Sequence, residues 1–141
     1  MSEKFLPKNE LEEKMLAAQN GHMPSEQFML ELLDMQVFIP VSDNQAIGGF
    51  NDHQKAKPLT VKDEAGSEVL ILFTSPERSR PFTDQFPEIN GGLLEHFRWV
   101  LGRVGSGISI SINPEVEVGI DFDPQMVTQL IHLNAQQQSE S

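Results

Sequence analysis

The segment from Gly107 to Leu130 constrains the fold more than any other part of the chain. Apolar and polar residues alternate from Ile108 to Asn113 and again from Val116 to Phe122, a period of two that is typical of strands with one buried face. The turn signal Asn113-Pro114-Glu115 lies between them and predicts a hairpin. Asp123-Pro124 then predicts a helix start, because Asp accepts from free N–H groups and Pro suits the first helical position. The polar residues of the first strand, which we expect to face solvent, are Ser109, Ser111 and Asn113.

Two helices are predicted near the N-terminus. Asn9 and Glu12 have the spacing of a capping box, so the first helix should begin there. It should end at Asn20-Gly21, because Gly is the usual residue for a left-handed C-terminal cap. A second, shorter helix should begin at Pro24 or Ser25.

Three stretches in the middle of the chain predict strands. Val37 to Val41 is apolar, and Pro40 should place this strand at a sheet edge or lie near its end, because Pro cannot donate to a ladder. The alternation at Leu59 and Val61 predicts a strand that turns at residues 63–66. The continuous apolar run in Glu68 to Phe73 predicts a strand buried on both faces near the sheet centre.

The next segment should hold helices. Three prolines in Thr74 to Asn90 exclude one long helix, although Ser75 can cap a short one with Pro76 at its first position. Gly91-Gly92 should open a longer helix, whose inner face would carry Leu93, Phe97, Val100, Leu101 and Val104.

These elements predict an α+β fold, with one antiparallel or mixed sheet of about four to six strands packed against about four helices. We expect a flexible N-terminal arm over residues 1–8, a single domain over residues 9–133 and a disordered polar tail over residues 134–141.

Composition limits the function. The net charge of −11 argues against binding of nucleic acid, which depends on Lys and Arg at phosphates. The chain has no cysteine, no apolar run of signal-peptide length and no stretch of about 20 apolar residues. We therefore expect an acidic cytoplasmic protein of bacterial type, without a membrane span.

No catalytic motif is present: GxSxG, Walker, GxGxxG, HExxH and kinase signatures are all missing. The histidines at 22, 53, 96 and 132 lack metal-ligand spacing, and the carboxylates between Glu115 and Asp123 are expected to form a solvated face. We expect no enzyme activity, no cofactor and no metal.

The best candidate for a small-ligand site follows the most buried strand. Thr74, Ser75, Arg78 and Arg80 combine a helix N-terminus with positive charge, which could bind an anion. The simpler interpretation is a helix cap beside two solvated arginines.

Three aromatic residues are the candidates for a partner site. Phe82 and Phe86 lie in a Pro-rich segment and could approach Trp99. They either cap the core or form an exposed apolar patch, and Trp and Phe are favoured anchors at interfaces.

The order of several motifs resembles the N-terminal domain of SseB-family proteins. The matching motifs are Asn9-x-Leu11-Glu12, the strand Val37 to Val41, the strand and loop Val69 to Arg78, and Gly107 to Pro114. The Phe-Thr-Ser loop and the Ile-Asn-Pro turn are the most specific of them. The resemblance spans roughly Asn9 to Leu133 and implies an α+β domain of a bacterial, cytoplasmic protein, with no catalytic residues to carry over.

The enteric member that gave the family its name, the enhanced serine sensitivity protein, has a further C-terminal domain. This chain ends soon after Leu133, so we expect any activity of that domain to be absent.

Three functions remain open at this point. A non-catalytic protein-interaction or regulatory module leads, with self-association through a strand edge as a variant. A sensor for an amino acid or another anion is the alternative. An unrecognised enzyme using carboxylates or His96 and His132 comes third.

Overall fold

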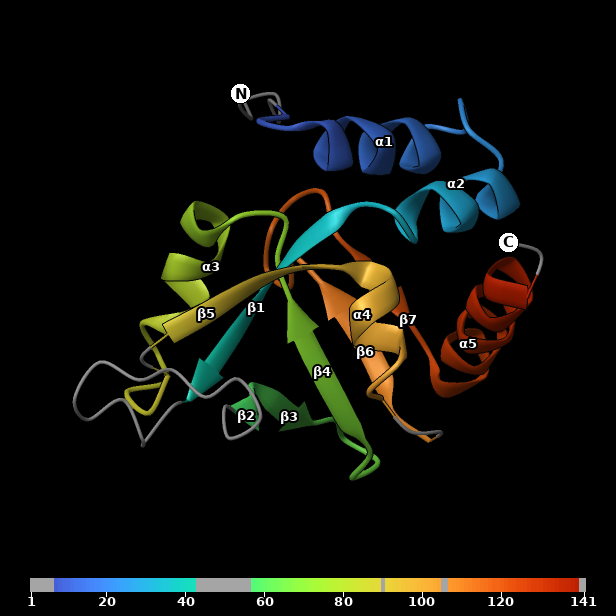
Figure 1. Ribbon diagram of the computed structural model, residues 1–141. Coiled ribbons are helices and arrows are strands. Elements are labelled where there is room, and N and C mark those ends of the chain that lie inside the picture. The colour runs from blue at the N-terminus through green and yellow to red at the C-terminus, as the bar shows by residue number, and fades with distance from the viewer. Residues whose placement is uncertain (1–6, 43–56, 90, 105–106, 140–141) are drawn as a thin grey trace.

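The computed structural model of the chain describes residues 7–42, 57–89, 91–104 and 107–139 (Figure 1). The helices are α1 (Glu10–Gln19), α2 (Ser25–Leu32), α3 (Pro76–Thr83), α4 (Phe97–Leu101) and α5 (Pro124–Ser139). The strands are β1 (Gln36–Ser42), β2 (Lys57–Pro58), β3 (Thr60–Lys62), β4 (Glu68–Leu72), β5 (Gly91–His96), β6 (Ser109–Ile112) and β7 (Ile120–Phe122). The predicted α+β class is confirmed.

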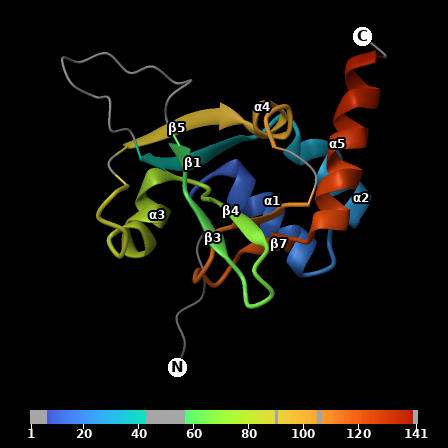
Figure 2. The same cartoon turned by 90° about the horizontal axis from the view of Figure 1, so that it is seen from below.

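The strands form two sheets instead of the predicted one. The first has the order β2-β1-β5 and is antiparallel, and the second has the order β3-β4-β6-β7. The second sheet is mixed, because β4 and β6 run parallel while the other pairs are antiparallel. An isolated bridge between Phe38 and Phe73 joins the two sheets, as do backbone hydrogen bonds of Leu59 to Pro40 and Ile71, and Figure 2 shows the sheets from below.

The predicted hairpin exists as β6 and β7, but its second strand is shorter than expected. Residues 113–119 form the connection, in which Asn113 and Glu115 both have positive φ angles. The expectation that Ser111 and Asn113 face solvent was wrong: their exposed fractions are 6% and 1%. The alternation of apolar and polar residues predicts on which face of the strand each side chain lies. Here other parts of the chain cover both faces of the strand.

Pro40 lies in the middle strand of its sheet, not at an edge. Its carbonyl accepts from the backbone N–H of Leu59, on the side of β1 that faces away from β5. The missing N–H of Pro40 is on the same side, so the proline removes no hydrogen bond between β1 and β5. The strand therefore tolerates proline because β2 covers only its end, at Val41 and Ser42.

The prediction that β4 is central and buried on both faces is confirmed. Leu70 and Leu72 belong to the main core, which also receives side chains from α1, α2, α4 and α5. Ile71 and Phe73 point to a second apolar cluster with Leu59. One continuous apolar run therefore supplies two cores.

Four helix ends that were predicted from local sequence signals are confirmed. Asn9 accepts from the backbone N–H of Glu12 at the start of α1, and Gly21 follows this helix with a φ of 79°. Ser75 caps α3 and Asp123 caps α5, where its carboxylate accepts from the N–H of Met126.

The predicted helix from Gly91 was wrong, because residues 91–96 form β5 and only Phe97–Leu101 are helical. All six residues of β5 pair with β1, from Gln36↔His96 to Val41↔Gly91. The spacing of Leu93 and Phe97 fits a helix, but it also fits alternation, and pairing with a distant strand decides between them.

The C-terminal helix also extends further than predicted, since α5 continues to Ser139. The expectation of disorder from residue 134 was therefore wrong for residues 134–139. Asn134 is buried and accepts a hydrogen bond from Arg98 at 2.8 Å, which ties α5 to α4. Within the described ranges, no helix is long and apolar enough to cross a membrane.

The β6–β7 connection requires glycine at one position. A Cβ at Gly119 would lie 2.6 Å from the carbonyl oxygen of Asn113 and 2.8 Å from that of Ile112. Both neighbours are backbone atoms that cannot move aside cheaply. We predict that Gly119→Ala lowers the free energy of unfolding by about 2 kcal/mol, measured by urea denaturation. Gly102→Ala is the control, because its Cβ would meet no atom closer than 3.6 Å; equal losses in the two variants would contradict the prediction.

Candidate functional site

The segment predicted to bind an anion lies against a buried carboxylate. The side chain of Glu12 is 0% exposed, and it is held by Arg78, whose Nε donates to Oε2 at 2.8 Å and whose Nη2 donates to Oε1 at 3.0 Å. The hydroxyl of Thr74 and the backbone N–H of Lys8 also donate to this carboxylate. A bidentate pair of this kind is strong and geometrically specific.

Thr74 and Asn113 connect this ion pair to the rest of the fold. The side-chain oxygen of Asn113 accepts from the backbone N–H of Thr74 at 3.0 Å, and its amide group donates to the carbonyl of Val118 at 3.2 Å. The amide of Asn9 donates to the carbonyl of Thr74 at 3.0 Å. Three distant parts of the chain therefore meet in one polar cluster, and no buried side-chain nitrogen or oxygen among the described residues lacks a hydrogen-bond partner.

The environment of Glu12 acts on its pKa in two directions. Burial raises the pKa, but the hydrogen bonds from Arg78, Thr74 and Lys8, together with the charge of Arg78, outweigh burial and lower the pKa below its ordinary value. Glu12 is therefore a charged group inside the protein, stabilised by its partners.

The remaining residues predicted for the small-ligand site do not converge. Ser75 accepts from the backbone N–H of Arg78 and acts as the helix cap. Arg80 is exposed on α3. The polar groups of this segment thus serve mainly the fold: Arg78 neutralises Glu12, and Thr74 joins the cluster.

The predicted aromatic patch is divided between two places. Phe82 and Phe86 are half-buried and stack with ring centroids 5.3 Å apart, and Phe82 lies 5.8 Å from Phe73 in the second cluster. Trp99 packs instead against the main core, with the guanidinium of Arg103 3.8 Å from the ring centroid. The three aromatic residues therefore do not form one surface.

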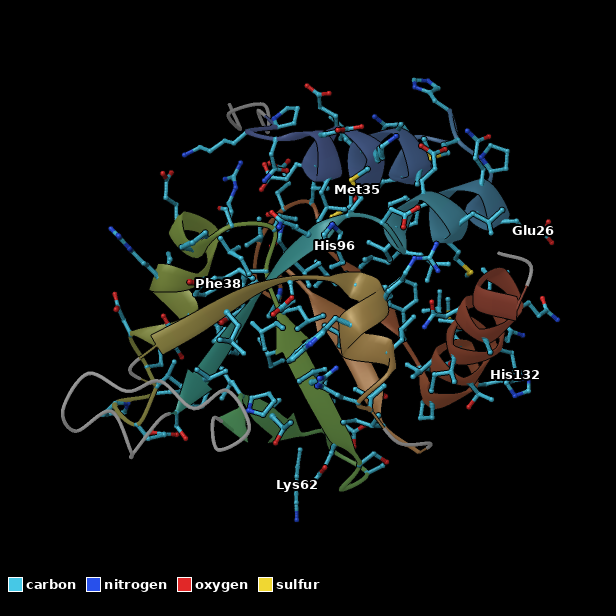
Figure 3. All side chains as sticks on the ribbon, viewed as in Figure 1. Glu26, Met35, Phe38, Lys62, His96 and His132 are labelled. Carbon is cyan, nitrogen blue, oxygen red and sulfur yellow. The ribbon has the colours of Figure 1, made fainter. Side chains whose placement is uncertain are left out.

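The histidines and acidic residues do not form a metal site in the part of the chain that the structure describes. His96 lies at the end of β5 and His132 on α5 (Figure 3), and both are exposed. His53 lies outside the described residues. Asp121 accepts from the hydroxyl of Ser111 at 2.7 Å, and Asp123 is the helix cap.

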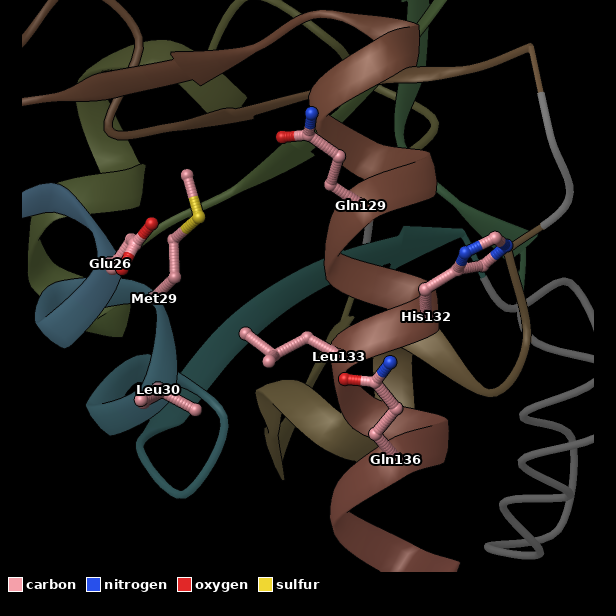
Figure 4. Close-up of a pocket in the computed structure, with 7 residues that line it drawn as sticks. All are labelled: Glu26, Met29, Leu30, Gln129, His132, Leu133 and Gln136. Atoms are coloured by element: carbon pink, nitrogen blue, oxygen red, sulfur yellow. The ribbon is translucent and has the colours of Figure 1, made fainter.

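A groove between α2 and α5 was not predicted from the sequence. We call it the α2–α5 groove; its volume is about 440 Å³, and its lining residues are Glu26, Met29, Leu30, Gln129, His132, Leu133 and Gln136. Leu133 extends from α5 toward α2, where Met29 and Leu30 lie (Figure 4). Leu30 is 40% exposed, one of two large apolar residues that stand out in this way among the described residues.

A second cavity of about 270 Å³ lies next to the groove and shares Met29 with it. Met15, Phe28, Phe122 and Met126 contribute to its lining. A sequence signal for this region did exist: α2 carries more apolar residues than one buried face needs. Its extra residues, Met29 and Leu30, are those that line the groove.

We predict that Glu12→Gln lowers the free energy of unfolding by about 3 kcal/mol, because the guanidinium of Arg78 would lose the charge of the buried Glu12 carboxylate. Chemical denaturation at neutral pH measures the loss. Glu77→Gln is the matched control, since Glu77 pairs with Lys8 at 3.3 Å on the surface and its loss should cost less than about 1 kcal/mol. Similar losses in both variants would show that the buried pair has no special role.

The lowered pKa of Glu12 predicts an acid-sensitive contribution to stability. A carboxyl whose pKa is lower in the folded state stabilises the protein fully above its unfolded value of about 4.5, and this stabilisation is lost as the pH falls toward the folded value. The difference in stability between the native protein and Glu12→Gln should therefore shrink as the pH falls below about 4.5. Urea titrations at each pH test this, and a constant difference would be inconsistent with it.

Comparison with known proteins identifies the family. Residues 11–129 match the SseB protein N-terminal domain. Neither the curated proteins nor the solved structures contain a significant match. The segments Phe73-Thr74-Ser75 and Ile112-Asn113-Pro114, on which the sequence resemblance rests most, meet in the polar cluster. Because the match covers most of its length, the chain belongs to the SseB family, and the part of the family that it matches is the N-terminal domain.

Proposed function

We propose that this domain is a non-catalytic protein-interaction module, and that its α2–α5 groove receives an amphipathic helix with basic flanking residues. The observation that carries the proposal is the open, largely apolar space between two helices. An amphipathic helix that lays its apolar face into such a groove is a common mode of peptide recognition.

The lining supports an adaptable apolar contact. Met29 and Leu30 of α2 face Leu133 of α5, and Met29 also borders the adjoining cavity with Met15 and Met126. Methionine is flexible and polarisable, so a methionine-rich wall can repack around different apolar side chains. Movement of the Met29 side chain would let an apolar side chain of the bound helix reach from the groove into the adjoining cavity.

Charge supports a basic partner. The groove lining contains Glu26 and no lysine or arginine, in a chain with a net charge of −11. Lys14 of α1 is paired with Glu31 of α2, and the hydrogen bond from Lys14 lowers the pKa of Glu31. A helix bearing Lys or Arg beside its apolar face would be attracted to this surface and orient on it.

The other surface is the stacked pair Phe82 and Phe86, which we considered from the sequence as a partner site. Both rings also cover Phe73 and Ile71 of the second cluster, so their burial has a structural role. The anion-sensor alternative is less favoured, because the arginine best placed for it, Arg78, is already paired with Glu12.

A model peptide tests the proposal. We predict that a labelled amphipathic peptide of leucine and lysine binds the protein with micromolar affinity by fluorescence anisotropy, and that the same peptide with glutamate for lysine does not. Leu30→Gln combined with Leu133→Gln should weaken binding of the basic peptide at least tenfold. Both substitutions are neutral, so the net charge that attracts the peptide is unchanged.

Phe86→Ser is the matched control, because it removes an apolar side chain from α3 without changing charge. All variants are first checked for a native circular dichroism spectrum. Equal binding by the native protein and the double groove variant would overturn the assignment to the groove. Loss of binding only in Phe86→Ser would move the site to α3, and no binding by the native protein would reject a basic helix as the ligand.

A further inference from the structure

Among the strands that the structure describes, β5 is an edge strand, with β1 on one side only. In the order β2-β1-β5 it lies at the end of the sheet, and Figure 2 shows it at the margin of the molecule with β1 on its inner side. An open edge presents unpaired N–H and C=O groups, which natural proteins usually protect with lysine, proline or a bulge. The sequence of β5, Gly91–His96, contains neither lysine nor proline, and Glu95 is its one carboxylate.

The register of the sheet determines which backbone groups point outward. Phe38 exchanges backbone hydrogen bonds with Phe73 at 2.7 and 2.9 Å, and so faces away from β5. In an antiparallel pair the direction alternates, so Val37 and Ile39 face β5, where they pair with Glu95 and Leu93. The remaining residues of β5, Gly92, Leu94 and His96, then direct their backbone groups to the outside.

These outward groups are available for a further strand. Within the part of the chain that the structure describes, no hydrogen bond involves the backbone N–H groups of Gly92, Leu94 and His96 or the carbonyls of Gly92 and Leu94. The carbonyl of His96 precedes α4 and serves the first turn of that helix. Five backbone groups thus remain along this edge.

The side chain at the centre of the same edge is apolar. Leu94 is 55% exposed, the largest value among the exposed large hydrophobic residues that the structure describes. Its partner across the sheet is Phe38, and a Cβ on Gly92 would lie 2.1 Å from the Phe38 ring, so this ring covers the glycine. Leu94 and Phe38 therefore form an apolar strip that ends at the open edge.

We propose that β5 pairs with β5 of a second copy of this chain, antiparallel and centred on Leu94. The pattern is self-complementary: the N–H and C=O of Leu94 would bond those of Leu94 in the other copy, and the N–H of His96 would donate to the carbonyl of Gly92. A two-fold axis at Leu94 repeats each bond, as an isologous dimer requires. The two apolar strips would join. Glu95 of one copy would lie opposite Leu93 of the other copy and not opposite the other copy's Glu95. The β2-β1-β5 sheets of the two copies would become one six-stranded sheet.

This inference does not rest on the α2–α5 groove, which shares no lining residue with β5. The net charge of −11 opposes association of two copies, and salt screens that repulsion. We therefore expect a dimer that strengthens as the salt concentration rises.

Sedimentation velocity tests the pairing. The mass of the native protein should rise from 15.8 kDa toward twice that value between about 1 and 200 µM, and the rise should begin at lower concentration in 0.5 M salt. Leu94→Lys should weaken dimerisation at least tenfold, whereas Leu30→Lys adds the same charge elsewhere and should leave dimerisation nearly unchanged. Both residues are exposed, and thermal melting confirms folding. A monomer up to 200 µM, or a dimer that Leu94→Lys leaves intact, would overturn the proposal.

Cross-linking tests the register. The chain has no cysteine, so each single-cysteine variant forms only one kind of disulfide. Directly opposed residues in a hydrogen-bonded pair have Cα atoms about 5.5 Å apart, within disulfide range. Leu94→Cys should form covalent dimers under mild oxidation at least ten times faster than Leu30→Cys. Equal rates for the two variants would contradict the pairing centred on Leu94.

Discussion

The charge of Glu12 is stable inside the protein only because four donors surround it. Burial alone would favour the neutral acid, yet the guanidinium of Arg78 binds both carboxylate oxygens, and Thr74 and the backbone of Lys8 add further hydrogen bonds. The partners come from segments more than 60 residues apart. The first helix can therefore occupy its place only when α3 and the end of β4 are also in place.

The same cluster explains why the two most specific family motifs carry no catalytic signature. Thr74 directly follows β4 and its flanking Phe73, and Asn113 begins the connection between β6 and β7, where its φ of 61° suits a short polar residue. Their hydrogen bonds hold the ends of two parallel strands together. Those motif residues thus hold the structure together, and the two surfaces that we propose for recognition lie elsewhere.

The two surfaces that we propose for recognition differ in physical character. The α2–α5 groove is lined by flexible side chains and bordered by negative charge, which suits a partner of opposite charge. The edge of β5 offers directional backbone groups and one exposed leucine, which suits a strand with the same pattern. Because their lining residues do not overlap, a pair of chains could bind a helix in each groove while joined through the sheet.

Local structure followed from the sequence wherever the deciding interaction lies within a few residues. Asn9, Ser75 and Asp123 cap their helices through groups three residues away, and Gly21 ends α1 because it adopts a positive φ without strain. The apolar run of β4 likewise indicated burial on both faces, since its composition suits no other environment.

The tertiary structure decided what depends on distant partners. Leu93 and Phe97 satisfy the spacing of a helix, yet pairing with β1, whose partner residues lie 50 to 60 positions earlier, makes residues 91–96 a strand. Glu12 has the spacing of a capping box and accepts the backbone N–H of Lys8, but Arg78 and Thr74, far away in the sequence, bind its carboxylate as well. The groove appears only when α2 and α5 are packed beside each other. The sequence alone therefore determined the family, the fold class and the helix caps, while the division into two sheets and the exposed surfaces arose from long-range pairing, for which local spacing carries no signal.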